Sequence, residues 1–130
     1  MVIDTSALFA IGLHEPERQV FGRTIMDAGI RLMSAATAVE FVTAFAARVS
    51  GVDAMEALDA LAARFEIQIV AVDHAQWREA AGALLRFGRG RHPARLNFGD
   101  SFAYALAKVT GEPLLYKGRD FTLTDIVAAI

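Results

Sequence analysis

The chain opens with Val2-Ile3-Asp4-Thr5-Ser6-Ala7-Leu8, in which two apolar β-branched residues lead to an acid and then to a segment suited to a helix. Residues 1–3 predict a short buried strand that ends at Asp4, and residues 6–12 predict a short helix. Similar apolar segments predict further strands at residues 30–33, 67–72 and 113–116. Short strands that are apolar on both faces and alternate with helices are typical of a parallel sheet covered on both sides. We therefore expect an α/β fold, a three-layer α/β/α sandwich around a short, mainly parallel sheet.

The remaining periodic segments predict the other helices of this sandwich. They cover residues 16–27, 36–49, 53–65, 73–87 and 98–109. A basic loop is expected at residues 88–96, and Asp125 starts a short terminal segment. The chain has no internal repeat or linker, and 130 residues with 55% hydrophobic content suit one domain over residues 1–130 with a sizeable core.

Composition narrows the classes of function. The chain has no Cys, which excludes disulfides, thiolate zinc sites and cysteine nucleophiles. No apolar run approaches about 18 residues without a charge, and the N-terminus lacks the pattern of a signal peptide, so we expect a cytoplasmic protein without a membrane span. The net charge of −2 argues against a molecule that is basic overall. The high apolar content predicts a surface covered by a partner or a second copy, unless the many alanines merely raise the average.

Acidic residues at separate places in the chain are the candidates for a functional site. They lie near predicted strand ends or helix starts, at Asp4, Glu40, Asp100 and Asp120. Asp4 and Asp120 follow strands, and Glu40 and Asp100 are expected in the first turns of helices. Sites of open parallel sheets form beyond the carboxyl ends of the strands, so all of these acids could share one edge. Two carboxylates about 4 Å apart repel by roughly 4 kcal/mol at an effective dielectric constant of about 20. A hard divalent cation usually offsets such repulsion.

Each acid also has an ordinary structural explanation when it is taken alone. Asp4 could cap the helix that follows it, and Glu40 could close a capping box with Thr37. Asp100 could interact with the positive end of a helix dipole, and Asp120 could be a turn residue. The combination of the acids favours a site more strongly than any one of them does.

Glu40 is the acid that is hardest to explain by structure alone. It is the only charged residue between Arg31 and Arg48, on a helix otherwise suited to burial. A desolvated carboxylate without a partner is costly, so a metal or a hydrogen-bond network must compensate it. Asp73 needs no such role, because it is expected to form a capping box with the Gln three residues later. Asp125 is likewise expected to be a helix cap.

Several of these motifs together carry a family resemblance. They are residues 2–8, Asn97-Phe98-Gly99-Asp100-Ser101-Phe102-Ala103-Tyr104-Ala105-Leu106-Ala107, Leu114-Leu115-Tyr116-Lys117-Gly118-Arg119-Asp120-Phe121 and Thr124-Asp125-Ile126. With them the chain resembles, nearly from end to end, the PIN-domain ribonucleases, and more narrowly the VapC-type toxins of bacterial toxin–antitoxin pairs. The resemblance implies a single PIN-like domain that acts as a metal-dependent endoribonuclease.

The resemblance also assigns roles to residues. It implies that Asp4, Glu40, Asp100 and Asp120 are the catalytic acids, and that Ser6 supports the first Asp and its metal-bound water. Related sequences often carry Asn or Asp where Arg119 stands here, which leaves Asp120 as the candidate fourth acid. Mg²⁺, with Mn²⁺ as an alternative, takes one or two carboxylates directly, and we expect these to be Asp4 and Asp100. Such an ion would activate a water and shield the phosphate, with one ion or two left open.

The basic loop is the candidate contact for the RNA backbone. Its arginines and one arginine just before it form a stretch of sequence without an acidic residue. They are Arg86, Arg89, Arg91 and Arg95. Arginine binds phosphate in a two-pronged manner, although a solvated surface loop would have the same composition. Trp77 and Tyr104 could stack on bases, but their helical spacing indicates that both belong to the core.

The resemblance further implies protein partners. A VapB-like antitoxin would cover the site, and members of the family commonly form homodimers. Apolar residues on two consecutive helices are candidates for a groove that receives an antitoxin helix, with a role as plain core as the alternative: Phe41, Phe45, Leu58, Leu61 and Phe65.

Other classes of protein fit the sequence less well. A non-catalytic PIN-like module that binds RNA or protein would not need all of these acids. A phosphatase of the haloacid dehalogenase type requires a second Asp two residues after the first, where Ser6 stands. A receiver domain requires an acidic pair before its phosphorylated Asp, and no P-loop motif is present.

Overall fold

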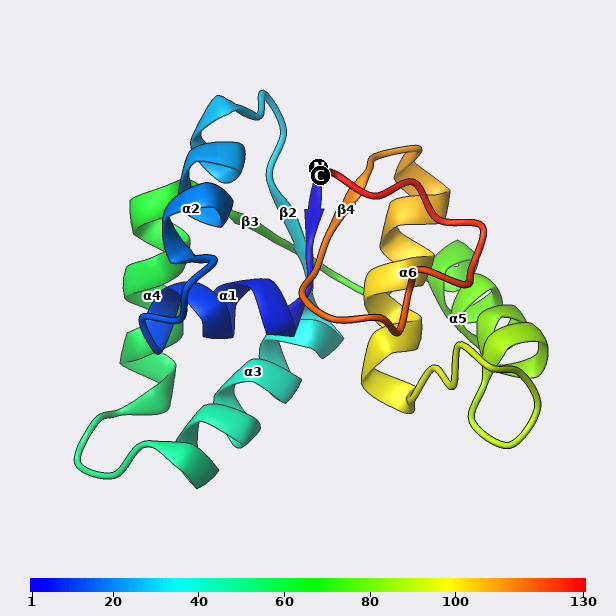
Figure 1. The fold of residues 1–130 in the computed structure, drawn as a ribbon, viewed down its shortest axis with the longest axis horizontal. Helices are drawn as coiled ribbons and strands as arrows, with labels where there is room; N and C mark the ends of the chain where they lie inside the picture. Colours follow the sequence, from blue (N-terminus) through cyan, green and yellow to red (C-terminus); the bar gives the residue numbers. More distant parts are fainter.

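A parallel sheet forms the centre of the computed structural model, which describes residues 1–130. Its strands lie in the order β3-β2-β1-β4 and all pair in parallel (Figure 1). They are β1 (Val2–Ile3), β2 (Leu32–Ser34), β3 (Gln68–Val70) and β4 (Leu114–Leu115). The first strand is central, because Val2 pairs with Leu32 on one side and with Leu114 on the other.

Helices cover both faces of the sheet. They are α1 (Thr5–Gly12), α2 (Arg18–Asp27), α3 (Ala35–Arg48), α4 (Ala54–Phe65), α5 (His74–Phe87) and α6 (Phe98–Thr110). Helices α1 to α4 lie on one side of the sheet and α5 and α6 on the other (Figure 1). The three-layer α/β/α sandwich expected from the sequence is confirmed.

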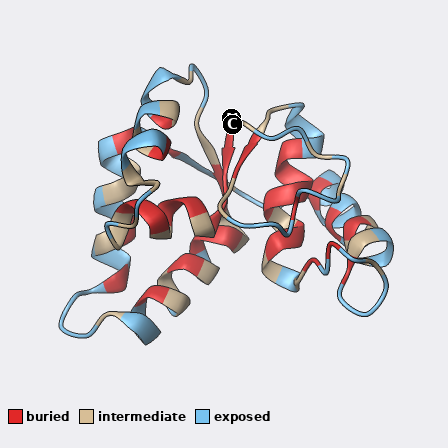
Figure 2. Cartoon of the chain, in the orientation of Figure 1, coloured by how far each residue is buried: buried red, intermediate tan, exposed pale blue.

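Alternate residues of β1, β2 and β4 enter two separate parts of the core. Ile3, Met33 and Leu115 are buried in the cluster under α1 to α4. Val2 and Leu114 point the other way, into the cluster under α5 and α6. Figure 2 shows the resulting concentration of buried residues on β1 and β4, on α1 and on α6, while β3 is mostly exposed. Fully burying an apolar side chain of this size contributes roughly 1.5–3 kcal/mol, so both faces hold the sheet in place.

Several element boundaries differ from the sequence prediction. The strand predicted at residues 67–72 is shorter, because the backbone N–H of Ile67 donates to Ala62 at the end of α4 and not to the sheet. The helix predicted from residue 16 begins at Arg18, after a turn that contains Pro16. Because α3 begins at Ala35, Glu40 lies in its second turn and not in the first.

Two expectations for α5 are wrong. Trp77 is 47% exposed, because α5 turns Gln76 and small alanines toward α6 in its place. Asp73 caps the helix by accepting from the Gln76 backbone at 2.8 Å, but no reciprocal bond completes a capping box. The Gln76 side chain donates instead to the carbonyl of Ala71 at 3.0 Å.

The C-terminal segment is tied to α5 and α6 by a polar cluster around a buried tyrosine. The Tyr104 hydroxyl donates to Asp125 and accepts from Arg86, and Lys108 lies 3.2 Å from Asp125. Burial and the Asp125 carboxylate raise the pKa of Tyr104, so it stays protonated. Tyr104 is fully buried and does not present its ring to RNA. Asp125 is therefore a partner of this cluster and not the predicted helix cap.

The ends of the chain lie side by side (Figure 1). The amino group of Met1 lies 2.7 Å from the Glu112 carboxylate, and Leu114 forms a bridge with Ala128. No helix combines the length and the apolar content needed to cross a bilayer.

Candidate active site at the carboxyl ends of the strands

The acids singled out by the sequence line one cavity at the carboxyl ends of β1 and β4. The cavity measures about 190 Å³. Its lining residues come from α1, α3, α6 and the segment after β4: Asp4, Thr5, Ser6, Phe9, Glu40, Ala44, Arg48, Asp100, Lys117, Asp120 and Phe121. We call this cavity the acidic cleft. The fold thus brings together side chains that are more than a hundred residues apart in the sequence.

Asp4 is buried at the point where β1 becomes α1. Its Oδ2 atom caps α1 by accepting from the Ser6 backbone at 2.9 Å, and it also accepts from the Ser6 hydroxyl. The Ser6 hydroxyl in turn accepts from the backbone N–H of Lys117 at 2.9 Å, which links α1 to the end of β4. The Oδ1 atom of Asp4 is buried and has no hydrogen-bond partner. One oxygen is therefore fixed, and the other is left for a ligand.

Glu40 is held by α1 and by the close approach of α6. The Thr5 hydroxyl donates to Glu40 Oε2 at 2.8 Å, so the capping box considered with Thr37 is not formed. Gly99 lies so close that a Cβ atom there would overlap the Glu40 carboxylate. A glycine at this position lets the first turn of α6 carry Asp100 up to α3.

Asp100 closes the capping box of α6. Its Oδ2 atom accepts from the Asn97 backbone at 2.7 Å, and the Asn97 side chain accepts from the Asp100 backbone at 2.9 Å. The residue is 8% exposed. Asp100 therefore stabilises the start of its helix, and the same carboxylate also lines the acidic cleft.

Asp120 is the least constrained of the acids. It follows Gly118, whose φ of 107° places it in the left-handed region, and both Asp120 and the adjacent Arg119 are exposed. Asp120 reaches the open side of the acidic cleft, where its charge acts on Asp100.

Burial and mutual repulsion disturb the ionisation of two acids. The pKa of Asp4 is raised to about 6, mainly by desolvation and to a smaller extent by the Glu40 charge, against the opposing hydrogen bonds from Ser6. Desolvation also raises the pKa of Asp100 to about 7, with contributions from Asp4, Asp120 and Glu40. The charged forms are costly without a cation in the acidic cleft.

The side chains of the cleft fit a hard divalent cation. No three His, Asp or Glu side chains lie close enough to hold one ion together. Mg²⁺ does not require three, since it commonly keeps several waters and takes one or two carboxylates. The free Oδ1 atom of Asp4 and the carboxylate of Asp100 are oxygen ligands of this kind. The absence of His and Cys from the lining makes the site unsuited to zinc.

Some lining residues were missed by reasoning from the sequence. Lys117 lies 2.7 Å from Glu15 and 2.8 Å from Glu17, so its charge is already neutralised. Arg48 also lines the cleft, and its spacing of eight from Glu40 was the signal that it shares a helix face. Thr5 and Gly99 carried no signal of their own, because their role depends on how helices cross.

The basic loop lies outside the acidic cleft. A hollow of about 440 Å³ runs along it, lined by Arg89, Gly90, Arg91, His92, Pro93 and Arg95. The loop is closed by a bridge between Gly88 and Leu96, and its arginines form no ion pair. Arg86 differs, because it donates to Tyr104 and lies 3.7 Å from Asp125. It is therefore part of the C-terminal cluster and not of the loop.

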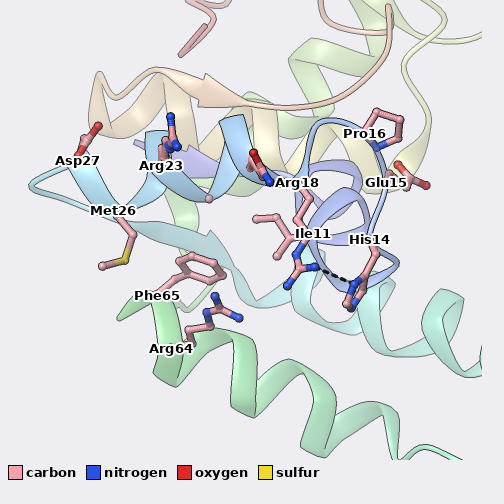
Figure 3. Close-up of a pocket in the computed structure, with 12 residues that line it drawn as sticks. Ile11, His14, Glu15, Pro16, Arg18, Arg23, Met26, Asp27, Arg64 and Phe65 are labelled. Carbon is pink, nitrogen blue, oxygen red and sulfur yellow. Dashed lines mark hydrogen bonds between the residues drawn. The ribbon is translucent and has the colours of Figure 1, made fainter.

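The groove predicted on α3 and α4 is not open. Phe41, Phe45, Leu58 and Phe65 are buried in the core, and Leu61 packs against them. A cavity of about 740 Å³ lies instead among α1, α2 and the end of α4 (Figure 3). Its lining residues are mostly polar: Ile11, His14, Glu15, Pro16, Arg18, Gln19, Gly22, Arg23, Met26, Asp27, Arg64 and Phe65.

The pH dependence of stability tests how costly it is to ionise Asp100 in the cleft. The folded protein holds this proton more tightly than the unfolded chain, whose Asp has a pKa near 3.8. The associated stability is present below the unfolded pKa and is lost as pH rises through the folded pKa of about 7. Without divalent cations, Asp100→Asn should therefore melt at least about 3 °C above the wild type near pH 8, and close to it near pH 4.

Calorimetry in the presence of EDTA measures this difference. Asp73→Asn is the matched control, since Asp73 is an exposed helix cap away from the cleft. A difference for Asp100→Asn that is the same at both pH values would contradict the raised pKa.

Comparison with known proteins assigns the fold to a family. The model of the PIN domain family matches residues 1–127. The chain is 45% identical over 128 residues to a protein of Mycolicibacterium smegmatis named Ribonuclease VapC, covering 98% of each chain. It is 46% identical over 127 residues to Ribonuclease VapC30 of Mycobacterium tuberculosis, covering 97% of this chain and 95% of that protein.

Solved structures share the same architecture. The toxin VapC20 of Mycobacterium tuberculosis, described as cleaving the sarcin–ricin loop, superimposes with a TM-score of 0.74 at 21% identity, over 97% of this chain and 95% of that one. A toxin–antitoxin complex from Klebsiella pneumoniae gives a TM-score of 0.68 at 14% identity, over 99% and 97%. These two likenesses support the fold, and the closer relatives identify the group. The resemblance seen in the sequence is confirmed: the chain belongs to the PIN-domain family and, within it, to the VapC ribonucleases.

Proposed function

We propose that this toxin hydrolyses RNA phosphodiester bonds in the acidic cleft, with Mg²⁺ or Mn²⁺ held by Asp4 and Asp100. The observation that carries the proposal is the buried Oδ1 atom of Asp4, which has no partner in a cleft lined by further carboxylates. Such an atom is costly unless a ligand compensates it. The ribonuclease names of relatives that are 45% and 46% identical to this chain support the reaction class.

The residues of the cleft would have different roles in hydrolysis. A bound cation would lower the pKa of a water and offset charge on the phosphate. Ser6 fixes Oδ2 of Asp4, so the free Oδ1 atom keeps one orientation. Thr5 fixes Oε2 of Glu40, and the other Glu40 oxygen can accept a proton from the attacking water. Asp120, on the open side, would orient waters around the site.

The proposal also covers the domain organisation of the protein and its location in the cell. Residues 1–130 would act as one PIN-like domain in the cytoplasm. The family model, which matches residues 1–127, supports a single domain. The many RNAs of the cytoplasm would be accessible to it there.

Replacing Asp4 by Asn tests the catalytic role most simply. The change keeps the shape of the side chain and removes a charged ligand, so cleavage of an RNA oligonucleotide should slow by at least about 100-fold. EDTA should abolish wild-type cleavage, and added Mg²⁺ or Mn²⁺ should restore it. Gel assays of cleavage rates measure both effects, with Asp73→Asn as the control. Equal cleavage rates for Asp4→Asn and wild type would contradict the catalytic role of Asp4, and a wild type that cuts no RNA with either ion would favour a non-catalytic RNA-binding module.

RNA would contact the protein beyond the cleft through the basic loop. Arg89, Arg91 and Arg95 have no acidic partner, and the loop leads into the first turn of α6, which carries Asp100. Replacing all three by Ser should reduce the slope of log affinity against log salt concentration by about 0.7 for each lost phosphate contact. Fluorescence anisotropy with a labelled RNA measures the slope. Arg78→Ser is the control, and an unchanged slope in the triple variant would make the loop a plain solvated surface.

We further propose that a VapB-like antitoxin inserts an apolar and acidic segment into the cavity among α1, α2 and α4. Arg18 and Arg64 point toward this cavity in Figure 3 without a carboxylate partner. Arg18 donates to His14 at 2.8 Å, and Arg64 lies 5.3 Å from the centre of the Phe65 ring. The lining holds three arginines, the third being Arg23, against the two acids Glu15 and Asp27, and it includes a few apolar side chains. This excess of positive charge beside apolar side chains suits an acidic peptide that carries apolar residues.

The free protein would also form a homodimer. Val39 and Phe98 are 64% and 72% exposed, next to the catalytic candidates Glu40 and Asp100, and a second copy could cover them.

Co-purification with the antitoxin tests both partner proposals. The double variant Arg18→Glu, Arg64→Glu should lose the co-expressed antitoxin, because it places like charges opposite an acidic segment. Arg78→Glu should retain it. Light scattering after gel filtration reports the mass, and so the number of toxin copies. Retention of the antitoxin by the double variant would refute this docking site, and a free toxin with monomer mass would refute the dimer.

A further inference from the structure

Two positively charged side chains line the acidic cleft, and only one of them forms an ion pair. Lys117 is neutralised by Glu15 and Glu17 at 2.7 and 2.8 Å. Arg48 forms no ion pair with any carboxylate, although it lines the same cavity as Glu40 and Asp4. An arginine that stays unpaired beside several acids must be held away from them by other contacts.

Those contacts come from α1 and from the helix of Arg48 itself. Its Nη1 atom donates to the Ala44 carbonyl at 2.9 Å, one turn earlier in α3. Its guanidinium lies 4.9 Å from the centre of the Phe9 ring, within the range of a cation–π interaction. The donors that are not used by Ala44 remain free for a ligand.

The Phe9 ring is itself supported by the core. It stacks on Phe41 with ring centres 5.0 Å apart, and Phe41 stacks on Phe45 at 5.4 Å. Phe41 and Phe45 are buried, so the ring under Arg48 rests on a fixed base. The position of the guanidinium is therefore set by packing and not by chance contacts at the surface.

Helix periodicity places Arg48 in line with the proposed catalytic acids. Glu40, Ala44 and Arg48 follow one another at intervals of four residues and share one face of α3. On α1, Thr5 and Phe9 have the same interval, and they meet Glu40 and Arg48 respectively. The two helices thus form one wall, with the acid at one end and the free cation at the other. Ala44 between them is small and leaves the wall open.

We propose that Arg48 is a substrate-binding residue that contacts a phosphate of the RNA flanking the bond that is cut. This inference rests on the proposed ribonuclease function and names how that site holds its substrate. The Arg48 guanidinium is folded back to the Ala44 carbonyl, and Ala44 lies about 6 Å from Glu40 along the axis of α3, since each residue of a helix rises about 1.5 Å. Its free donors therefore lie about one helical turn beyond Glu40, where they would reach a neighbouring phosphate and not the one under attack. Arginine can bind that phosphate through two hydrogen bonds at once.

The role predicts a specific kinetic effect. A contact to a flanking phosphate is made equally in the ground state and in the transition state, so its loss raises KM and leaves kcat nearly unchanged. For Arg48→Met, which keeps the apolar stem on Phe9, we expect KM to rise about tenfold, the size expected for a charge-assisted hydrogen bond. Arg48→Lys keeps the charge but not the two-pronged geometry, and should recover part of the affinity.

A binding assay without cleavage gives the independent test. In the Asp4→Asn background, adding Arg48→Met should lower the affinity for a labelled single-stranded RNA by about tenfold and reduce the salt slope by about 0.7. Arg78→Met is the matched control, because Arg78 also lies over an aromatic ring, 5.5 Å from the centre of Trp77, but does not line the cleft. The control should keep the affinity, the slope and the KM of the parent, and equal melting temperatures would show that both variants are folded.

The outcomes separate this inference from the function on which it rests. If the wild type cuts RNA, Asp4→Asn does not, and Arg48→Met matches Arg78→Met in KM and salt slope, then Arg48 does not bind substrate and only this inference is overturned. A fall in kcat with unchanged KM would also overturn it. If the wild type and Asp4→Asn cut equally, or neither cuts, the proposed function fails. RNA binding then decides for Arg48, and an unchanged affinity and salt slope in Arg48→Met would overturn this inference as well.

Discussion

The repulsion among buried carboxylates at one edge of the sheet is the constraint on which this structure depends. Parallel pairing of β1 with β4 brings Asp4 next to the segment that carries Asp120. The approach of α3 and α6 adds Glu40 and Asp100 on the same side. The pKa values of Asp4 and Asp100 are raised mainly by desolvation, and this repulsion adds to the shift. Buried, mutually repelling acids cost stability, so their presence favours the proposal that this edge holds a cation.

Much of the local structure around the cleft holds one oxygen of each acid except Asp120. Ser6 holds Asp4, Thr5 holds Glu40, and the backbone of Asn97 holds Asp100. These bonds fix the orientation of the carboxylates without neutralising them. Because α1 directly follows the first strand and also contacts α3, one short helix provides the hydrogen-bond donors for both Asp4 and Glu40.

The sequence predicted the sandwich and the choice of acids because both follow from local patterns. Short apolar segments that alternate with helical ones predicted the strands. Acids directly after two of these strands indicated the edge of the sheet where Asp4 and Asp120 meet. What it could not predict depends on how helices cross. The exposed side of Trp77, the pairing of Tyr104 with Asp125, and the approach of Gly99 to Glu40 arise from tertiary contacts with no signature in any single segment.

The central claim is that the acidic cleft binds a divalent cation through Asp4 and Asp100. A crystal of the protein soaked in Mn²⁺ and measured for anomalous scattering tests it directly. The account predicts one strong peak within bonding distance of Asp4 Oδ1 and of an Asp100 oxygen. A fully soaked crystal with no peak in the cleft, or with a peak bound only by other residues, would contradict it.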